Sequence, residues 1–161
     1  MNAAASGFRL KLAPQGDREI LITRQFKAPR TLVFEAFTTP SMVMQWMDTP
    51  SFPITRCEID LRVGGALRYE WSSPTGGGMG VSGEFLAIDP PSRLVHTEIF
   101  DEDWTDGESE VTTTFAETDG ITLVTMTICY RTGATRDTVM KTNMEQGIAK
   151  NFDNLDTLLS N

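Results

Sequence analysis

The sequence contains a single histidine, two cysteines and no long apolar run. One histidine cannot form a multi-histidine metal site, and Cys57 and Cys129 lie in strand-like segments without the CxxC spacing of zinc or redox motifs. We therefore expect two small core residues, no disulfide framework, and no metal or other cofactor. No stretch approaches the roughly 18 apolar residues of a transmembrane helix, and the first residues lack the apolar block of a signal peptide. The expected location is the cytoplasm.

Basic residues are also scarce relative to acidic ones. The 14 Lys and Arg residues stand against 22 Asp and Glu residues, which gives a formal net charge of −8. Such a surface repels phosphate backbones and anionic headgroups, so neither nucleic acid nor a membrane surface is an expected partner. The sequence does contain enough hydrophobic residues, 40% of 161, to bury the core of one domain. We expect a single domain over residues 1–161.

Hydrophobic periodicity predicts an α+β order of elements. Residues 1–18 form an extension that can add one strand, since residues 8–12 alternate before a turn at Pro14–Asp17. A strand follows, and then two short helices that Pro29 and Pro40 delimit. The other predicted elements are a strand at 19–26, six further strands at 54–62, 66–73, 79–88, 92–100, 109–117 and 121–130, and one long amphipathic helix at 136–158.

Two adjacent glycines interrupt the strand-like segment DLRVGGALRYEW. A three-residue turn there places Leu61 opposite Leu67, so that the apolar faces of the two strands agree. This register requires a left-handed backbone conformation at Gly65, which glycine adopts without strain. It also directs Tyr69 and Trp71 toward the concave side of the predicted sheet.

Four segments occur in the order RQFKAPRTLVFEAFTTPSMVMQWM, EIDLRVGGALRYEW, GEFLAIDPPSRLVHTEIFDEDW and MEQGIAKNFDNLDTLL. Together they resemble the SRPBCC (START-like, helix-grip) superfamily, and within it the family of the activator of the heat-shock-protein-90 ATPase. The resemblance covers about residues 19 to 159. It implies a helix-grip fold, in which a curved antiparallel sheet of about seven strands surrounds a long C-terminal helix, with two short helices after the first strand. The sequence differs from the family's pattern at Met47 and Ile148, where aromatic side chains are common, and both differences are expected to enlarge or reshape a cavity.

The resemblance implies binding of a small hydrophobic or aromatic ligand in a cavity between sheet and helix, without a shared catalytic motif. The residues expected to line the cavity are Trp46, Tyr69, Trp71, Phe85, His96, Met126, Met144 and Phe152. Methionine adapts to irregular apolar ligands, but the same set is equally consistent with an ordinary filled core. His96 is either a polar anchor or acid–base group in the pocket or, as we favour, a strand histidine that is half exposed or hydrogen-bonded to a neighbour. Trp104, in an acidic loop, is a candidate lid.

Three functions stay open. The favoured one is a binding protein for a small apolar molecule. The second is a co-chaperone-like protein that docks on a large ATPase, as the family resemblance implies. The third is a cyclase- or hydrolase-type enzyme of the same superfamily, for which only His96 and a few carboxylates are available, so no catalytic residue is assigned. The candidate partners are a small apolar molecule, a chaperone, and a second copy of the chain in a homodimer.

Overall fold

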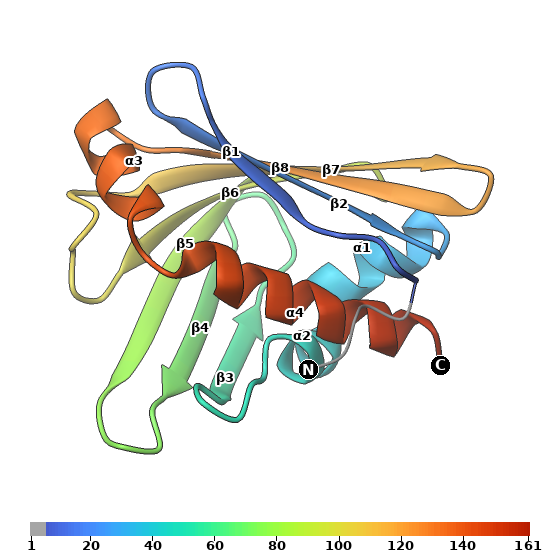
Figure 1. Ribbon diagram of the computed structural model, residues 1–161, viewed down its shortest axis with the longest axis horizontal. Helices are drawn as coiled ribbons and strands as arrows, with labels where there is room; N and C mark the ends of the chain where they lie inside the picture. Colours follow the sequence, from blue (N-terminus) through green and yellow to red (C-terminus); the bar gives the residue numbers. More distant parts are fainter. Residues whose placement is uncertain (1–5) are drawn as a thin grey trace.

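Eight strands form one antiparallel sheet in the computed structural model, which describes residues 6–161 (Figure 1). Their order across the sheet is β1-β2-β8-β7-β6-β5-β4-β3. Consecutive strands pair with each other, except that β2 pairs with β8 and not with β3, which forms the edge opposite β1. The bounds are β1 (Lys11–Gln15), β2 (Glu19–Phe26), β3 (Ile54–Ile59), β4 (Ala66–Ser72), β5 (Gly78–Asp89), β6 (Arg93–Phe100), β7 (Ser109–Thr118) and β8 (Ile121–Cys129). The predicted antiparallel α+β fold is confirmed, and the N-terminal extension contributes the edge strand β1.

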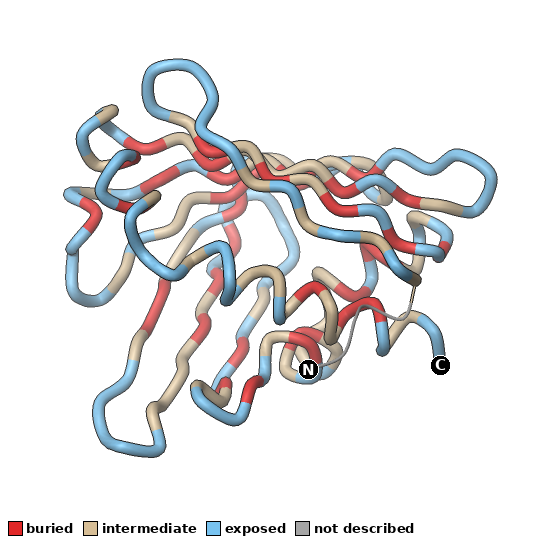
Figure 2. The backbone as a smooth tube through the Cα atoms, viewed as in Figure 1, coloured by how far each residue is buried: buried red, intermediate tan, exposed pale blue. Residues whose placement is uncertain are grey.

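The helices are α1 (Arg30–Thr38), α2 (Pro40–Trp46), α3 (Gly133–Met140) and α4 (Met144–Leu159). Of these, α1, α2 and α4 lie on the concave side of this sheet, and α3 lies at one end of it, beside the turn between β1 and β2 (Figure 1). In Figure 1, α4 crosses the concave side, with α1 and α2 behind it at one end, and β3, β4 and β5 stand at a steep angle to the other strands. Figure 2 shows buried segments where strands and helices face one another, and exposed segments at the hairpin turns. Within residues 6–161, no helix has the length and hydropathy needed to cross a membrane.

Strand β1 continues through Pro14, where a turn was predicted. Pro14 pairs with Ile20 of β2. A proline is tolerated at this position because β1 is an edge strand, where a missing N–H need not interrupt a ladder on its outer side.

Strand β2 shows how alternating side chains build the concave face. Ile22 and Phe26 are fully buried, and the ring of Phe26 lies 5.7 Å from a phenylalanine ring of α4. Arg24 shares this face, and its guanidinium lies 3.2 Å from Asp153 and 3.8 Å from Asp156. Both carboxylates belong to α4, so a buried ion-pair cluster joins the sheet to the C-terminal helix.

Two prolines set the limits of α1 and α2. Pro29 precedes the first residue of α1, and Pro40 occupies the first turn of α2, where its missing N–H would have no helical partner in any case. The indole N–H of Trp46 donates to the carbonyl of Ala36 at 2.9 Å, and its ring lies 5.0 Å from that of Phe37. The two helices therefore hold Trp46 in a fixed position against the core.

The predicted single helix at 136–158 is wrong, because α3 ends at Met140 and α4 begins at Met144. The Thr142 hydroxyl donates to the carbonyl of Val139 at 2.7 Å and accepts from the N–H of Met144 at 3.3 Å. Such bonds between a threonine side chain and neighbouring backbone compete with the helical hydrogen-bond ladder. The C-terminal region is therefore two helices joined by a short turn.

The register predicted for the β3–β4 turn is also wrong. Ile59, not Leu61, pairs with Leu67. Leu61 lies within the turn and is 42% exposed. The left-handed residue is Gly64, with φ of +84°, and not Gly65.

Backbone hydrogen bonds to a third strand explain this difference. The N–H of Gly64 donates to the carbonyl of Phe85 at 2.8 Å, and the carbonyl of Gly65 accepts from the N–H of Phe85 at 3.0 Å. These bonds fix a turn longer than the two strands alone would need. Gly65 is required for space, since a β-carbon there would clash with the carbonyl oxygen of Asp60.

Candidate functional site

A cavity, here called the inner cavity, lies between the concave face of the sheet and α4. Its volume is about 100 Å³. It is lined by Phe37, Trp46, Met47, Leu67, Tyr69, Phe85, Leu94, His96, Glu98, Thr113, Met126, Ile148, Asn151 and Phe152. Since an apolar cavity of roughly 150 Å³ can hold benzene, this space suits a molecule of about one ring.

The structure brings six of the eight candidate residues together in this lining, namely Trp46, Tyr69, Phe85, His96, Met126 and Phe152. Trp71 lies outside the lining, at the C-terminal end of β4, where its ring stacks 6.5 Å from that of Phe52. Met144 packs against the core at the first turn of α4 and is not part of the lining. These two assignments are therefore corrected. Ile148, one turn further along α4 than Met144, lines the cavity together with Asn151 and Phe152 of the same helix.

Contacts between aromatic rings fix the apolar wall. The ring of Phe152 lies 5.8 Å from Trp46, 6.0 Å from Phe37 and 5.7 Å from Phe26. Tilted and edge-to-face arrangements at these distances are the ones that aromatic pairs prefer. The wall is therefore formed before any ligand arrives.

Met47 and Ile148, the two positions at which the sequence differs from the family's pattern, both line the inner cavity. Both are half-buried, so they border the cavity where it approaches solvent. Methionine and isoleucine side chains are smaller than those of tryptophan and phenylalanine, so they take up less of the cavity.

The polar end of the cavity is formed by His96 and Glu98. Because they are two residues apart on β6, their side chains project from the same face of the sheet. Nε2 of His96 lies 2.9 Å from Oε2 of Glu98, and the histidine is 9% exposed. Its Nδ1 is buried and has no hydrogen-bond partner within residues 6–161. His96 is therefore not half exposed: it contacts a neighbour on its own strand and also lines the cavity, with one ring nitrogen available.

Sequence reasoning missed Glu98 as part of the site, although its spacing from His96 was a usable signal. Burial raises the pKa of Tyr69 well above its usual value, and the negative charge of Glu98 adds to that shift. Burial and Glu98 raise the pKa of Tyr130 in the same way. Both phenols are therefore neutral at physiological pH. The carboxylate of Glu98 that acts on them is hydrogen-bonded to His96 through one of its two oxygens.

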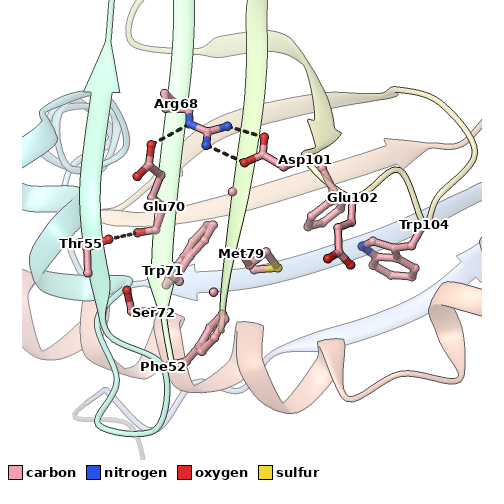
Figure 3. Close-up of a pocket in the computed structure, with 13 residues that line it drawn as sticks. Phe52, Thr55, Arg68, Glu70, Trp71, Ser72, Met79, Asp101, Glu102 and Trp104 are labelled. Carbon is pink, nitrogen blue, oxygen red and sulfur yellow. Dashed lines mark hydrogen bonds and ion pairs between the residues drawn. The ribbon is translucent and has the colours of Figure 1, made fainter. Parts of the chain in front are cut away.

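A second hollow, here called the outer groove, opens on the surface at the C-terminal end of β4 and the N-terminal end of β5 (Figure 3). Its volume is about 590 Å³. Figure 3 shows the guanidinium of Arg68 between two carboxylates: it donates to both oxygens of Asp101 at 2.7 Å and to Glu70 at 3.0 Å. Trp104, the candidate lid, lines this groove, and not the inner cavity, with its ring 5.3 Å from that of Phe100.

A glycine makes room for this charge cluster. A β-carbon at Gly80 would clash with the carboxylate of Asp101 and lie 2.5 Å from the guanidinium of Arg68. The hydrogen bonds from Arg68 lower the pKa of Asp101. The cluster joins β4 to the loop after β6, and this structural role accounts for the charges in the outer groove.

The polar groups of the inner cavity are few, and His96 and Glu98 form the one acid–base pair of its lining. Among residues 6–161, no group of three or more His, Cys, Asp or Glu side chains is placed to hold a metal ion. Cys57 and Cys129 are free thiols outside the lining, and burial, with a contribution from Glu58, raises the pKa of Cys57 to about 11. The arrangement can therefore enclose an apolar molecule and exchange a hydrogen bond with it at His96.

Comparison with known proteins identifies the family. The sequence profile described as "Activator of Hsp90 ATPase homolog 1-like protein" matches residues 27–160, which include every residue of the inner-cavity lining. Solved structures similar to this chain include a crystal structure from Rhodobacter sphaeroides, with 29% identity, coverage of 94% of this chain and 98% of that chain, and a TM-score of 0.89. Another is protein Ms6760 from Mycobacterium smegmatis, with 28% identity, coverage of 92% and 97%, and a TM-score of 0.80.

A solution structure of a protein from Arthrobacter aurescens has the same fold at 22% identity, with coverage of 93% and 91% and a TM-score of 0.82. No curated protein matches this chain in sequence. The family match spans most of the chain and agrees with the resemblance seen in its four ordered segments. The chain belongs to the family of Activator of Hsp90 ATPase homolog 1-like proteins.

Proposed function

We propose that this protein binds a small, predominantly apolar molecule of about one ring in the inner cavity. The observation that carries the proposal is an unfilled space of about 100 Å³ between preformed aromatic walls. Protein interiors are close-packed, and voids larger than a water molecule are few. The fold of this family, which commonly binds small hydrophobic ligands, supports the same conclusion.

The size of the inner cavity restricts the ligand. A long acyl chain does not fit within about 100 Å³, whereas a single ring comes close to filling it. A ring in contact with Trp46 and Phe152 would be removed from water on most of its surface, at roughly 25 cal/mol per Å² of apolar area before ordering costs. Toluene is therefore a suitable first probe.

Isothermal titration of toluene into three proteins tests the proposal. The wild type should bind toluene with saturation at one site per chain. Ile148→Trp places a bulky ring in the lining and should weaken binding at least tenfold. Met144→Trp, the matched control, introduces the same ring one turn earlier on α4, outside the lining, and should bind like the wild type.

Equal toluene affinity in wild type and folded Ile148→Trp would place the ligand outside the inner cavity and contradict the proposal. If no single-ring probe binds the wild type, the alternative that the family description supports, docking on a chaperone ATPase, becomes the better interpretation. An enzymatic function would require substrate to reach His96, since it belongs to the one acid–base pair in the lining. If the cavity admits no small molecule, the enzymatic function is therefore contradicted as well.

A further inference from the structure

We propose that the inner cavity selects neutral ligands that carry a hydrogen-bond donor, above all a phenol-like hydroxyl group, and rejects carboxylates. This inference rests on the proposed function and specifies the class of ligand. It is carried by the pairing of His96 with Glu98 in the lining.

The pairing determines which nitrogen of His96 is free to accept a hydrogen bond. An ionised carboxylate only accepts, so with a neutral imidazole the hydrogen sits on Nε2 and is donated to Glu98 at 2.9 Å. Nδ1 then carries a lone pair and no hydrogen. It is buried without a partner among residues 6–161, and an unpaired buried polar atom lowers the stability of the free protein. A donor on the ligand would supply the missing bond.

The charge of the lining discriminates against anions. The residues that form it include Glu98 and neither lysine nor arginine. A carboxylate ligand would therefore bring a second negative charge close to Glu98, in mostly apolar surroundings and without a lysine or arginine to pair with. Glu98 also adds to the rise that burial causes in the pKa of Tyr69, a neighbouring residue of the lining. The net charge of −8 acts in the same direction.

Three single-ring probes separate the possibilities: toluene, phenol and benzoate, titrated at pH 7. Phenol should bind at least as tightly as toluene, although its hydroxyl makes it less hydrophobic, because it can donate to His96. Benzoate should bind at least tenfold more weakly than phenol. Benzoate binding as tight as phenol, or phenol binding weaker than toluene, would overturn the inference while leaving the proposed function intact. In this titration series, the proposed function itself fails when none of the three binds.

Variants assign the selectivity to particular atoms. His96→Phe removes the acceptor and should lower phenol affinity relative to toluene about tenfold. Glu98→Gln keeps the size of the side chain, removes its charge, and should raise benzoate affinity relative to phenol at least tenfold. Thr112→Val, on the opposite face of the sheet from Thr113 of the lining, is the control and should change neither ratio.

Unchanged ratios in the folded variants would overturn the inference. If His96→Phe does not fold, the wild-type probe series still decides it, because phenol against toluene reads the acceptor at His96 and benzoate against phenol reads the charge of Glu98.

Discussion

Gly64 and Gly65 are adjacent in the chain but are required for different reasons. Gly64 has φ of +84°, and a β-carbon there would meet nothing within 4 Å, so only its backbone conformation favours glycine. At Gly65 a β-carbon would clash with the carbonyl oxygen of Asp60 and lie 2.9 Å from that of Arg62. Here the requirement is space, imposed by neighbouring backbone that cannot move independently.

Alanine at each glycine should therefore have unequal effects. Gly64→Ala is expected to lower the free energy of unfolding by about 1 kcal/mol, the usual cost of a left-handed alanine. Gly65→Ala should cost about 2–3 kcal/mol, because the whole turn must shift. Urea denaturation measures both. A larger loss for Gly64→Ala than for Gly65→Ala would show that conformation, and not space, limits this turn.

The sequence alone indicated that this turn needs glycine, but it placed the left-handed conformation at the wrong residue. A hairpin considered by itself offers no reason for the longer turn. The reason lies in the backbone bonds between this turn and Phe85 of β5, a residue about twenty positions away in the chain. The sequence of the hairpin alone does not reveal these bonds to a third strand.

Among the elements, β2 and α4 are joined by a buried charge as well as by apolar packing. The guanidinium of Arg24 is fully buried, and its partners are the half-buried Asp153 and the almost fully buried Asp156. The carboxylate of Asp156 also accepts the backbone N–H of Ser6 at 2.7 Å. The pair thus fixes how the C-terminal helix sits on the sheet, and so the position of the cavity wall.

Removing one member of this cluster should be costly. Arg24→Met leaves the carboxylate of Asp156 buried without its counter-charge, and should lower the free energy of unfolding by about 3 kcal/mol. The double variant Arg24→Met/Asp156→Leu should recover at least half of that loss, since no unpaired buried charge remains. Urea denaturation of the single and double variants is the measurement. A double variant no more stable than Arg24→Met would show that the unpaired carboxylate of Asp156 is not the cause of the loss.

Periodicity located the elements well because most of them have one buried face. Strands β3 to β8 and the two short helices lie where alternation and proline placed them. The break between α3 and α4 was missed because the apolar stripe continues through Val139, Met140 and Met144. What interrupts the helix is the hydroxyl of Thr142, whose bonds to the local backbone leave no trace in hydrophobic spacing.

At the scale of the whole molecule, the cavity depends on how far the sheet curves and where α4 lies across it. Composition could nominate eight side chains, seven aromatic or methionine residues and His96, and six of the eight reach the lining of the inner cavity. It could not place Trp71, which belongs to the outer groove, or Met144, which lies one turn short of the cavity. Those outcomes are set by sheet curvature and helix position, which arise only when all the elements pack together.

The space between α4 and the sheet is tested most directly by a crystal structure determined under xenon pressure. Xenon enters apolar cavities and needs no polar partner, so it reports the space itself, whatever the natural ligand is. We predict a xenon atom bounded by Trp46, Phe85 and Phe152, in the inner cavity of about 100 Å³. Electron density showing these three side chains packed against one another, with no xenon between α4 and the sheet, would contradict the binding function proposed for this protein.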